Sequence, residues 1–185
     1  MGDHNELKGM LMSAEGTLPH VYLDTVGLVT VGVGHMIPNA EAAQALSFVV
    51  RANGAAATPD QIAAEYANVS RQQKGLLAAR YQQFTALDMT DSAIQDLLSA
   101  DVAAIEAGVA SRFAGYDGYP EPAQDALLDM AFNLGVAGLA SHFPHLKAAA
   151  EAKDWATCAA QCHRNGISDE RNDRTKALFE SAVSA

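Results

Sequence analysis

Three side chains near the start of the chain carry the groups needed to hydrolyse a glycosidic bond. Glu15 precedes a glycine at the expected end of a helix, Asp24 begins a turn, and Thr30 follows on a strand. The carbonyls at a helix end disfavour a charged carboxylate and so favour the protonated form that a general acid needs. A second carboxylate beside a hydroxyl can hold and activate a water molecule. The set indicates acid/base hydrolysis, although a helix end and a turn also account for each residue singly.

Two short elements must position these groups. Apolar residues recur with helical spacing over residues 5–14 and predict a helix that Gly16 ends. Residues 24–27 have turn composition, and the alternation over residues 28–35 predicts one strand. On that strand Thr30 shares a face with two glycines, which suits close approach by a ligand or another backbone.

The spacing Glu-x8-Asp-x5-Thr, followed by Gly-x-Gly-His, resembles the catalytic segment of the phage-type lysozymes, glycoside hydrolase family 24. Residues 126–135 and 169–179 are similar to two later helices of that family. The resemblance implies a muramidase in which Glu15 protonates the glycosidic oxygen, while Asp24 and Thr30 activate a water on the opposite ring face. It also implies cleavage of the β-1,4 bond between N-acetylmuramic acid and N-acetylglucosamine with inversion, and no metal or organic cofactor.

The same resemblance extends to five further residues. By position, Met36, Phe132 and Asn133 match residues that border the family's cleft, so we expect them to bind substrate, although Phe132 also suits a core position. Asp101 lies on the apolar stripe of a long predicted helix, where a carboxylate without a partner is costly. The resemblance implies that its partner is His35, in an ion pair with a structural role.

The expected fold is α+β and lysozyme-like, with a small β-hairpin lobe and a larger helical lobe joined by a long helix. We expect one domain over residues 1–185. The catalytic helix and hairpin occupy residues 1–37, and the long helix with the C-terminal lobe occupies about 87–185. The family resemblance thins over about 38–86, where the pattern predicts a helical insertion over residues 40–52 and 58–84, the second part open to interruption at Gly75. The insertion could pack, line the cleft or dock a partner.

Charge and hydropathy limit the partners. A net charge of −10 excludes non-specific nucleic-acid binding and steering toward anionic wall polymers. No apolar run approaches the ~20 residues that a membrane helix needs, and the start of the chain has no signal-peptide pattern. We therefore expect a monomer that acts on peptidoglycan glycan strands in the periplasm or outside the cell. Its export would use a non-classical route, a phage holin or a larger secreted protein.

Several alternatives stay open at this point. A lytic transglycosylase needs the acid but no residue that activates water, so Asp24 and Thr30 argue against it. An inactive wall-binding module would not need the three residues together. The chain could be a phage endolysin, a housekeeping enzyme or an antibacterial effector with delivery machinery and an immunity protein. Cys158 and Cys162, beside His163, are expected to be small buried hydrophobes and not metal ligands.

Overall fold

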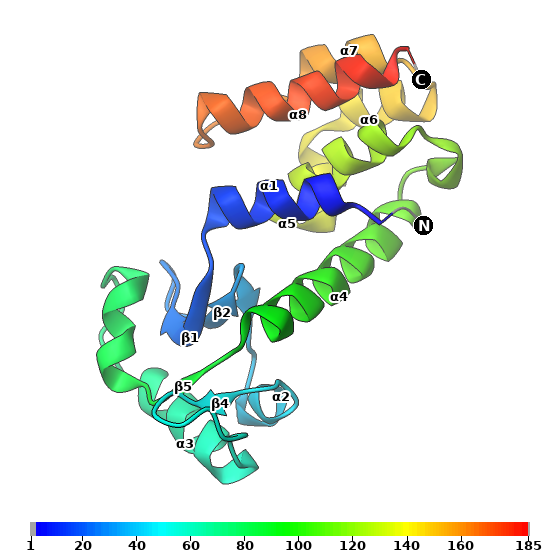
Figure 1. Cartoon of the computed structure of the whole chain (residues 1–185). Coiled ribbons are helices and arrows are strands. Elements are labelled where there is room, and N and C mark those ends of the chain that lie inside the picture. The colour runs from blue at the N-terminus through cyan, green and yellow to red at the C-terminus, as the bar shows by residue number, and fades with distance from the viewer. Residues whose placement is uncertain (1–2, 185) are drawn as a thin grey trace. The chain divides into compact units, whose positions relative to one another are not determined.

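Helices make up most of the regular structure, and two small antiparallel sheets supply the rest within residues 3–184, which the computed structural model describes (Figure 1). The elements are α1 (Asn5–Glu15), β1 (Leu18–Leu23), β2 (Val29–Gly32), β3 (His35–Met36), α2 (Ala40–Gln44), β4 (Val49–Val50), α3 (Pro59–Val69), the 3-10 helix η1 (Ala78–Phe84), β5 (Leu87–Asp88), α4 (Asp91–Ala110), the 3-10 helix η2 (Tyr116–Gly118), α5 (Glu121–His142), α6 (Pro144–Glu151), α7 (Trp155–Gln161) and α8 (Asp169–Ala182). This content confirms the predicted α+β class.

Side-chain caps start three of the helices. The Thr58 hydroxyl accepts the N–H of Gln61 at 3.3 Å, while the Gln61 side chain accepts the N–H of Thr58 at 2.8 Å. This reciprocal capping box starts α3. The hydroxyls of Thr90 and Ser168 each accept the N–H three residues further on and start α4 and α8. These starts were predictable because each cap is a local interaction.

The chain forms two compact units. Unit 1 comprises Met1–Ala14 and Asp101–Ala185, and unit 2 comprises Glu15–Ala100. The division falls inside α4, so this helix contributes residues to both units. Helix α1 belongs to unit 1 with the C-terminal helices, except for its last residue, Glu15, which belongs to unit 2.

The three-stranded sheet of unit 2 has the strand order β1–β2–β3 and contains the hairpin over which Asp24 and Thr30 lie. The prediction of one strand over residues 28–35 is wrong beyond Gly32. This glycine has a φ of +66°, the chain reverses, and β3 then pairs antiparallel with β2. A Cβ on Gly32 would lie 3.6 Å from the Ile94 side chain of α4, an ordinary van der Waals distance, so at this position the positive φ and not a close approach favours glycine.

The segment over residues 38–86 is only partly helical. The predicted helix over 40–52 ends at Gln44, because the β-branched pair Val49 and Val50 pairs with β5 instead. The segment over 58–84 is interrupted around Gly75, which has a φ of +87° and lies in the turns that separate α3 from η1. Arg51 closes this part of the unit, since its guanidinium binds both carboxylate oxygens of Asp88 at 2.7 Å.

Helices α5, α6, α7 and α8 form the core of unit 1, with α8 packed on both α5 and α7. Residues 125–131 of α5 are all buried. Among the described residues no single helix is long and apolar enough to cross a membrane; α5 and α6 pass that test only together, across a bend of 85°.

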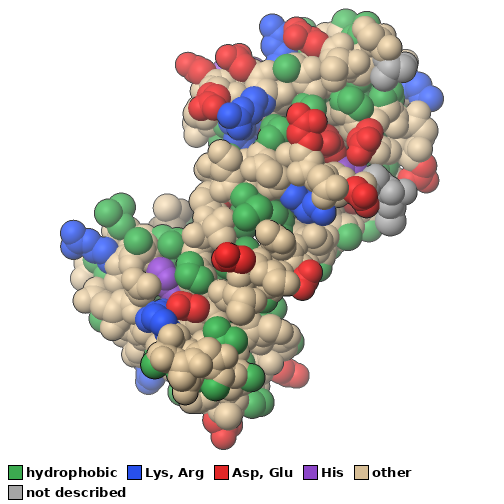
Figure 2. All heavy atoms as spheres, in the orientation of Figure 1, with side chains coloured by type: hydrophobic (Ala, Val, Ile, Leu, Met, Phe, Trp, Pro, Cys, Tyr) green, Lys and Arg blue, Asp and Glu red, His purple; other side chains and the backbone are tan. Residues whose placement is uncertain are grey.

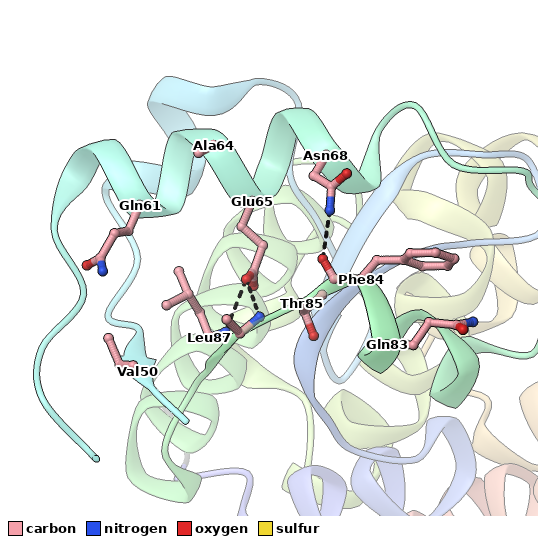
Figure 3. Close-up of a pocket in the computed structure, with 10 residues that line it drawn as sticks. Val50, Gln61, Ala64, Glu65, Asn68, Gln83, Phe84, Thr85 and Leu87 are labelled. Carbon is pink, nitrogen blue, oxygen red and sulfur yellow. Dashed lines mark hydrogen bonds between the residues drawn. The ribbon is translucent and has the colours of Figure 1, made fainter. Parts of the chain in front are cut away.

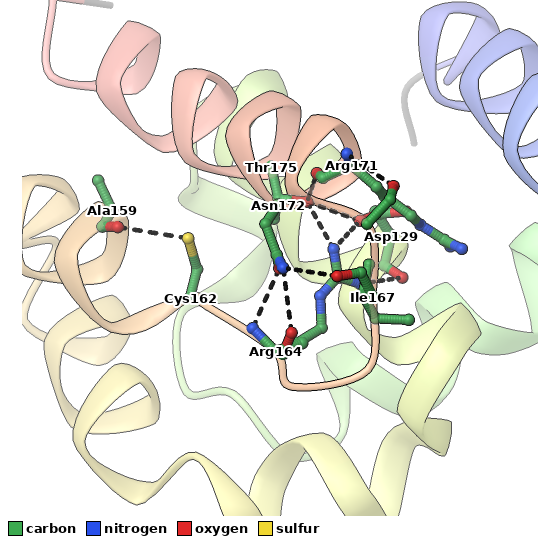
Figure 4. A network of polar contacts seen from close by, with 9 residues as sticks. Asp129, Ala159, Cys162, Arg164, Ile167, Arg171, Asn172 and Thr175 are labelled. Carbon is green, nitrogen blue, oxygen red and sulfur yellow. Dashed lines mark hydrogen bonds and ion pairs between the residues drawn. The ribbon is translucent and has the colours of Figure 1, made fainter.

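A buried ion cluster centred on Asp129 joins α5 to the C-terminal part of unit 1 (Figure 4). One carboxylate oxygen of Asp129 accepts a hydrogen bond from Arg164 Nη2 at 2.6 Å, and the other accepts from Arg171 Nε at 2.9 Å. The Thr175 hydroxyl lies 2.7 Å from the first oxygen. Asp129 is 1 % exposed and Arg164 is 2 % exposed, so the charges are desolvated and depend on one another.

A second buried cluster holds the start of the chain. Nδ1 of His4 pairs with Asp125 on α5, and Nε2 of His4 lies 3.3 Å from Glu106 Oε1 on α4. All three side chains are buried. Burial raises the pKa of Asp125, and the contact with His4 opposes that shift. The cluster therefore ties the residues before α1 to two helices of unit 1.

Candidate active site

Glu15 ends α1, as the sequence predicts. Gly16 follows it with a φ of +75°, a left-handed conformation that glycine adopts without a steric penalty. The Glu15 side chain is exposed. The local sequence therefore places a carboxyl group at the carboxyl end of a helix, on the surface, where a substrate can reach it.

The Asp24 carboxylate is held in one orientation by the turn between β1 and β2. Its Oδ1 accepts three backbone N–H groups, from Val26 at 2.9 Å, Gly27 at 2.8 Å and Leu28 at 2.8 Å. The backbone of Asp24 closes the same turn through its N–H, which donates to the Leu28 carbonyl at 2.9 Å. None of these bonds uses Oδ2, so this oxygen is available to a water molecule while Oδ1 fixes the side chain.

Thr30 lies in β2 and is 3 % exposed. Its hydroxyl donates to the Leu28 carbonyl at 3.1 Å, which leaves the lone pairs of Oγ1 as acceptors. Thr30 is directly opposite Tyr22 in β1 and Met36 in β3. Because cross-strand partners project from the same face of an antiparallel sheet, these three side chains share a face. Asp24 and Thr30 therefore belong to the same β-hairpin.

Tyr22, directly opposite Thr30, lies next to the candidate residues and was not among the predicted ones. Its pKa is raised, first by burial, then by the negative charge of Asp24 and then by that of Glu15. Both carboxylates therefore act on one phenol, which keeps its proton and remains a hydrogen-bond donor. The pattern of an extended strand could have identified it. Tyr22 lies two residues before Asp24, and residues two apart in an extended chain point to the same face.

The other predicted residues are distributed over both units. Met36 and His35 form β3 in unit 2, where Met36 is 47 % exposed and His35 is half-buried. Phe132 and Asn133 are neighbours on α5 in unit 1, the first half-buried and the second exposed. Asp101 is half-buried on α4, at the first position of unit 1 in that helix. The pairing of His35 with Asp101 stays a prediction.

The two cysteines are buried and have free thiols. Burial raises the pKa of Cys158 to about 12, so this thiol keeps its proton near neutral pH. Within residues 3–184 no three His, Cys, Asp or Glu side chains lie together so as to hold a metal ion. The predicted burial of Cys158 and Cys162 is confirmed, since they are 0 % and 2 % exposed.

The surface charge agrees with the composition. On the face drawn in Figure 2 the Lys and Arg side chains stand apart from one another, with Asp and Glu side chains among them. A polyanion that binds through its phosphates needs clustered cations. This face offers no such cluster among the described residues.

A known protein family matches most of the chain. The sequence model of a family described as Phage lysozyme matches residues 12–178, from the last turn of α1 into α8, and this range includes all of the candidate residues. The match also spans residues 38–86, where the motifs themselves are weakest. No curated protein matches the chain.

Proposed function

Because the chain belongs to the phage lysozyme family, which makes it a peptidoglycan hydrolase of the cell wall, we propose that it is an inverting muramidase. It cleaves the β-1,4 bond between N-acetylmuramic acid and N-acetylglucosamine. The observation that carries this proposal is the turn at Asp24, where three N–H groups hold one carboxylate oxygen and leave the other for water, in the hairpin that also carries Thr30.

In the proposed reaction Glu15 gives its proton to the glycosidic oxygen as the bond to the anomeric carbon breaks. Oδ2 of Asp24 takes a proton from a water molecule that attacks this carbon from the opposite face. The Thr30 hydroxyl oxygen accepts the second hydrogen of that water and orients it. Tyr22, kept neutral by its surroundings, borders the same water site. A single displacement of this kind inverts the anomeric carbon.

Product analysis tests the reaction. Purified peptidoglycan digested in oxygen-18 water should give reducing muramic acid ends that carry the label, because the hydroxyl at the anomeric carbon comes from solvent. Proton NMR of the first product should show the α-anomer. Unlabelled anhydro-muramic ends would instead identify a lytic transglycosylase, and a β-anomer would identify a retaining hydrolase.

The proposed substrate contacts follow from exposure. Met36 lies beside Thr30 on the shared face of the sheet and is accessible, so we propose that it packs against a sugar ring. Asn133 is exposed on α5 and offers an amide to the substrate, and Phe132 supports it from a half-buried position. These contacts involve only the glycan strand and no cofactor.

We also propose that His35 and Asp101 form a structural ion pair. In a double-mutant cycle of His35→Asn and Asp101→Asn, measured by urea unfolding, the two side chains should couple by about 0.5–3 kcal/mol. The coupling arises because each substitution alone removes the same interaction. Additive effects of the two substitutions would show that the pair does not exist.

The acidic surface favours delivery by another component. A protein of net charge −10 is repelled by anionic wall polymers, so its own charge does not concentrate it at the wall. We therefore favour an antibacterial effector that reaches the periplasm through a secretion or delivery machine, over an endolysin. A producing cell would then need an immunity protein that covers the catalytic residues.

A further inference from the structure

One stretch of unit 2 is positively charged, although the chain as a whole is acidic. Residues 66–87 hold three of the chain's twelve Lys and Arg residues, namely Arg71, Lys74 and Arg80, and none of its 22 Asp and Glu residues. Lys74 and Arg80 are exposed, and within residues 3–184 neither side chain has an ion-pair or hydrogen-bond partner. Their charges are therefore available to an anionic ligand.

This stretch is fixed to its neighbours on both sides. The Asn68 side-chain amide of α3 donates to the Phe84 carbonyl of η1 at 2.8 Å (Figure 3). Nε2 of His20 on β1 lies 3.2 Å from the Ala78 carbonyl oxygen at the start of η1. The cations between α3 and η1 therefore belong to a segment that is held against the same β1 that leads into the hairpin turn.

Lys74 packs directly on the turn that orients Asp24. Gly27 donates its N–H to Asp24 Oδ1 at 2.8 Å, and its φ of +94° suits glycine. Cδ of Lys74 lies 3.4 Å, and its Cβ 3.7 Å, from the position that a Cβ on Gly27 would occupy. The aliphatic part of this lysine therefore covers the turn, which makes Lys74 a cation that borders the proposed catalytic carboxylate without being bound to it.

The surface around this contact is also apolar. Val26 and Leu28, on either side of Gly27, are 68 % and 47 % exposed. A ligand that matches this surface carries a carboxylate together with small apolar groups. The peptide stem attached to N-acetylmuramic acid has both, because it contains alanine methyl groups and free carboxylates, whereas the N-acetylglucosamine units carry no carboxylate.

We propose that Lys74 is a specificity-determining residue that binds a carboxylate of this peptide stem. The inference rests on the proposed function, in which the water held by Asp24 attacks the anomeric carbon of N-acetylmuramic acid. The ring held at Asp24 is then the ring that carries the stem, and Lys74 is the cation beside it. Arg71 and Arg80 add positive potential from the same segment, which locally offsets the repulsion expected from a net charge of −10.

The test compares two substrates with the full chain. The first is a soluble glycan fragment with intact peptide stems, and the second is the same fragment after its stem carboxylates have been converted to methylamides. Lys74→Gln should raise KM for the intact fragment about two- to fivefold, the range of an exposed ion pair. The kcat should not change, because Lys74 does not touch the reacting atoms. For the methylamide fragment, wild type and Lys74→Gln should have the same KM.

Three comparisons separate this contact from general charge. Lys74→Arg keeps the cation and should keep the wild-type KM. Arg112→Gln, at an exposed arginine of unit 1, removes the same charge and should leave KM unchanged. Added salt should reduce the difference between wild type and Lys74→Gln, because exposed charge pairs are screened.

The inference is wrong if Lys74→Gln has the wild-type KM for the intact fragment, if its KM rises equally for both fragments, or if Arg112→Gln has the same effect. When wild type cuts the fragment, any of these results removes Lys74 and leaves the proposed function standing. When wild type cuts neither fragment, the proposed function fails, and calorimetric binding of the two fragments decides on Lys74. Weaker binding by Lys74→Gln of the intact fragment alone supports the contact with the stem, and equal binding by both proteins overturns it.

Discussion

Replacing Glu15 by glutamine is expected to lower the rate of peptidoglycan hydrolysis by at least about 100-fold. Glutamine has nearly the size of glutamate but cannot give a proton to the glycosidic oxygen. The residue is exposed at the end of α1, so the substitution should leave the fold intact. Clearing of a peptidoglycan zymogram, together with the release of reducing ends in solution, measures the effect.

The matched control is Glu41→Gln, which changes an exposed glutamate on α2 and should retain full activity. In the same assay, Asp24→Asn removes the negative charge of this side chain and keeps its hydrogen bonds in the turn. The amide oxygen of asparagine can still accept the three N–H groups of the turn, while the negative charge that activates water is lost. Clearing by Glu15→Gln or Asp24→Asn at the wild-type rate would remove that residue from the catalytic assignment.

The largest effect on stability is expected from Asp129→Asn, which should lower the free energy of unfolding by about 3–5 kcal/mol. Asparagine keeps the size of the side chain, but Arg164 and Arg171 then lose the anion that both of them bind. Because these groups are buried, water cannot replace the lost charge. For a chain of this length the melting temperature should fall by roughly 10 °C. Urea unfolding and calorimetry measure the two quantities.

Asp173→Asn is the control for this substitution, since Asp173 is an exposed aspartate on α8, the helix that carries Arg171. Its expected change in stability is within about 0.5 kcal/mol. A loss below about 1 kcal/mol for Asp129→Asn would mean that the two arginines find other partners or water. Equal losses for both variants would mean that the overall charge, and not the cluster, sets the stability.

Several features of the site were predictable because they depend on neighbours in sequence. Gly16 ends α1 just after Glu15, and the turn at Asp24 follows from an aspartate three residues before a glycine. Thr58 caps α3 for the same kind of reason. In each case the interacting groups lie within four residues, so residue type and spacing carry the information.

The errors arose where strand pairing overrode the pattern of residue types. Residues 28–35 alternate like one strand, but Gly32 has a φ of +66° and the chain reverses there, so that β3 pairs with β2. Residues 40–52 have helical composition, but Val49 and Val50 pair with β5, almost forty residues further along the chain. Propensity is a weak prior that such tertiary pairings override.

By itself the sequence determined the carboxylate at a helix end, the second carboxylate in a turn, the threonine that follows and the family to which the spacing belongs. The tertiary structure alone decided three further features: Tyr22 facing Thr30, the charges buried around Asp129, and the Lys74 side chain packed on Gly27. Caps and turns are formed by groups close in sequence. Burial and charge pairing depend on which distant residues the fold brings together, and no local pattern specifies that.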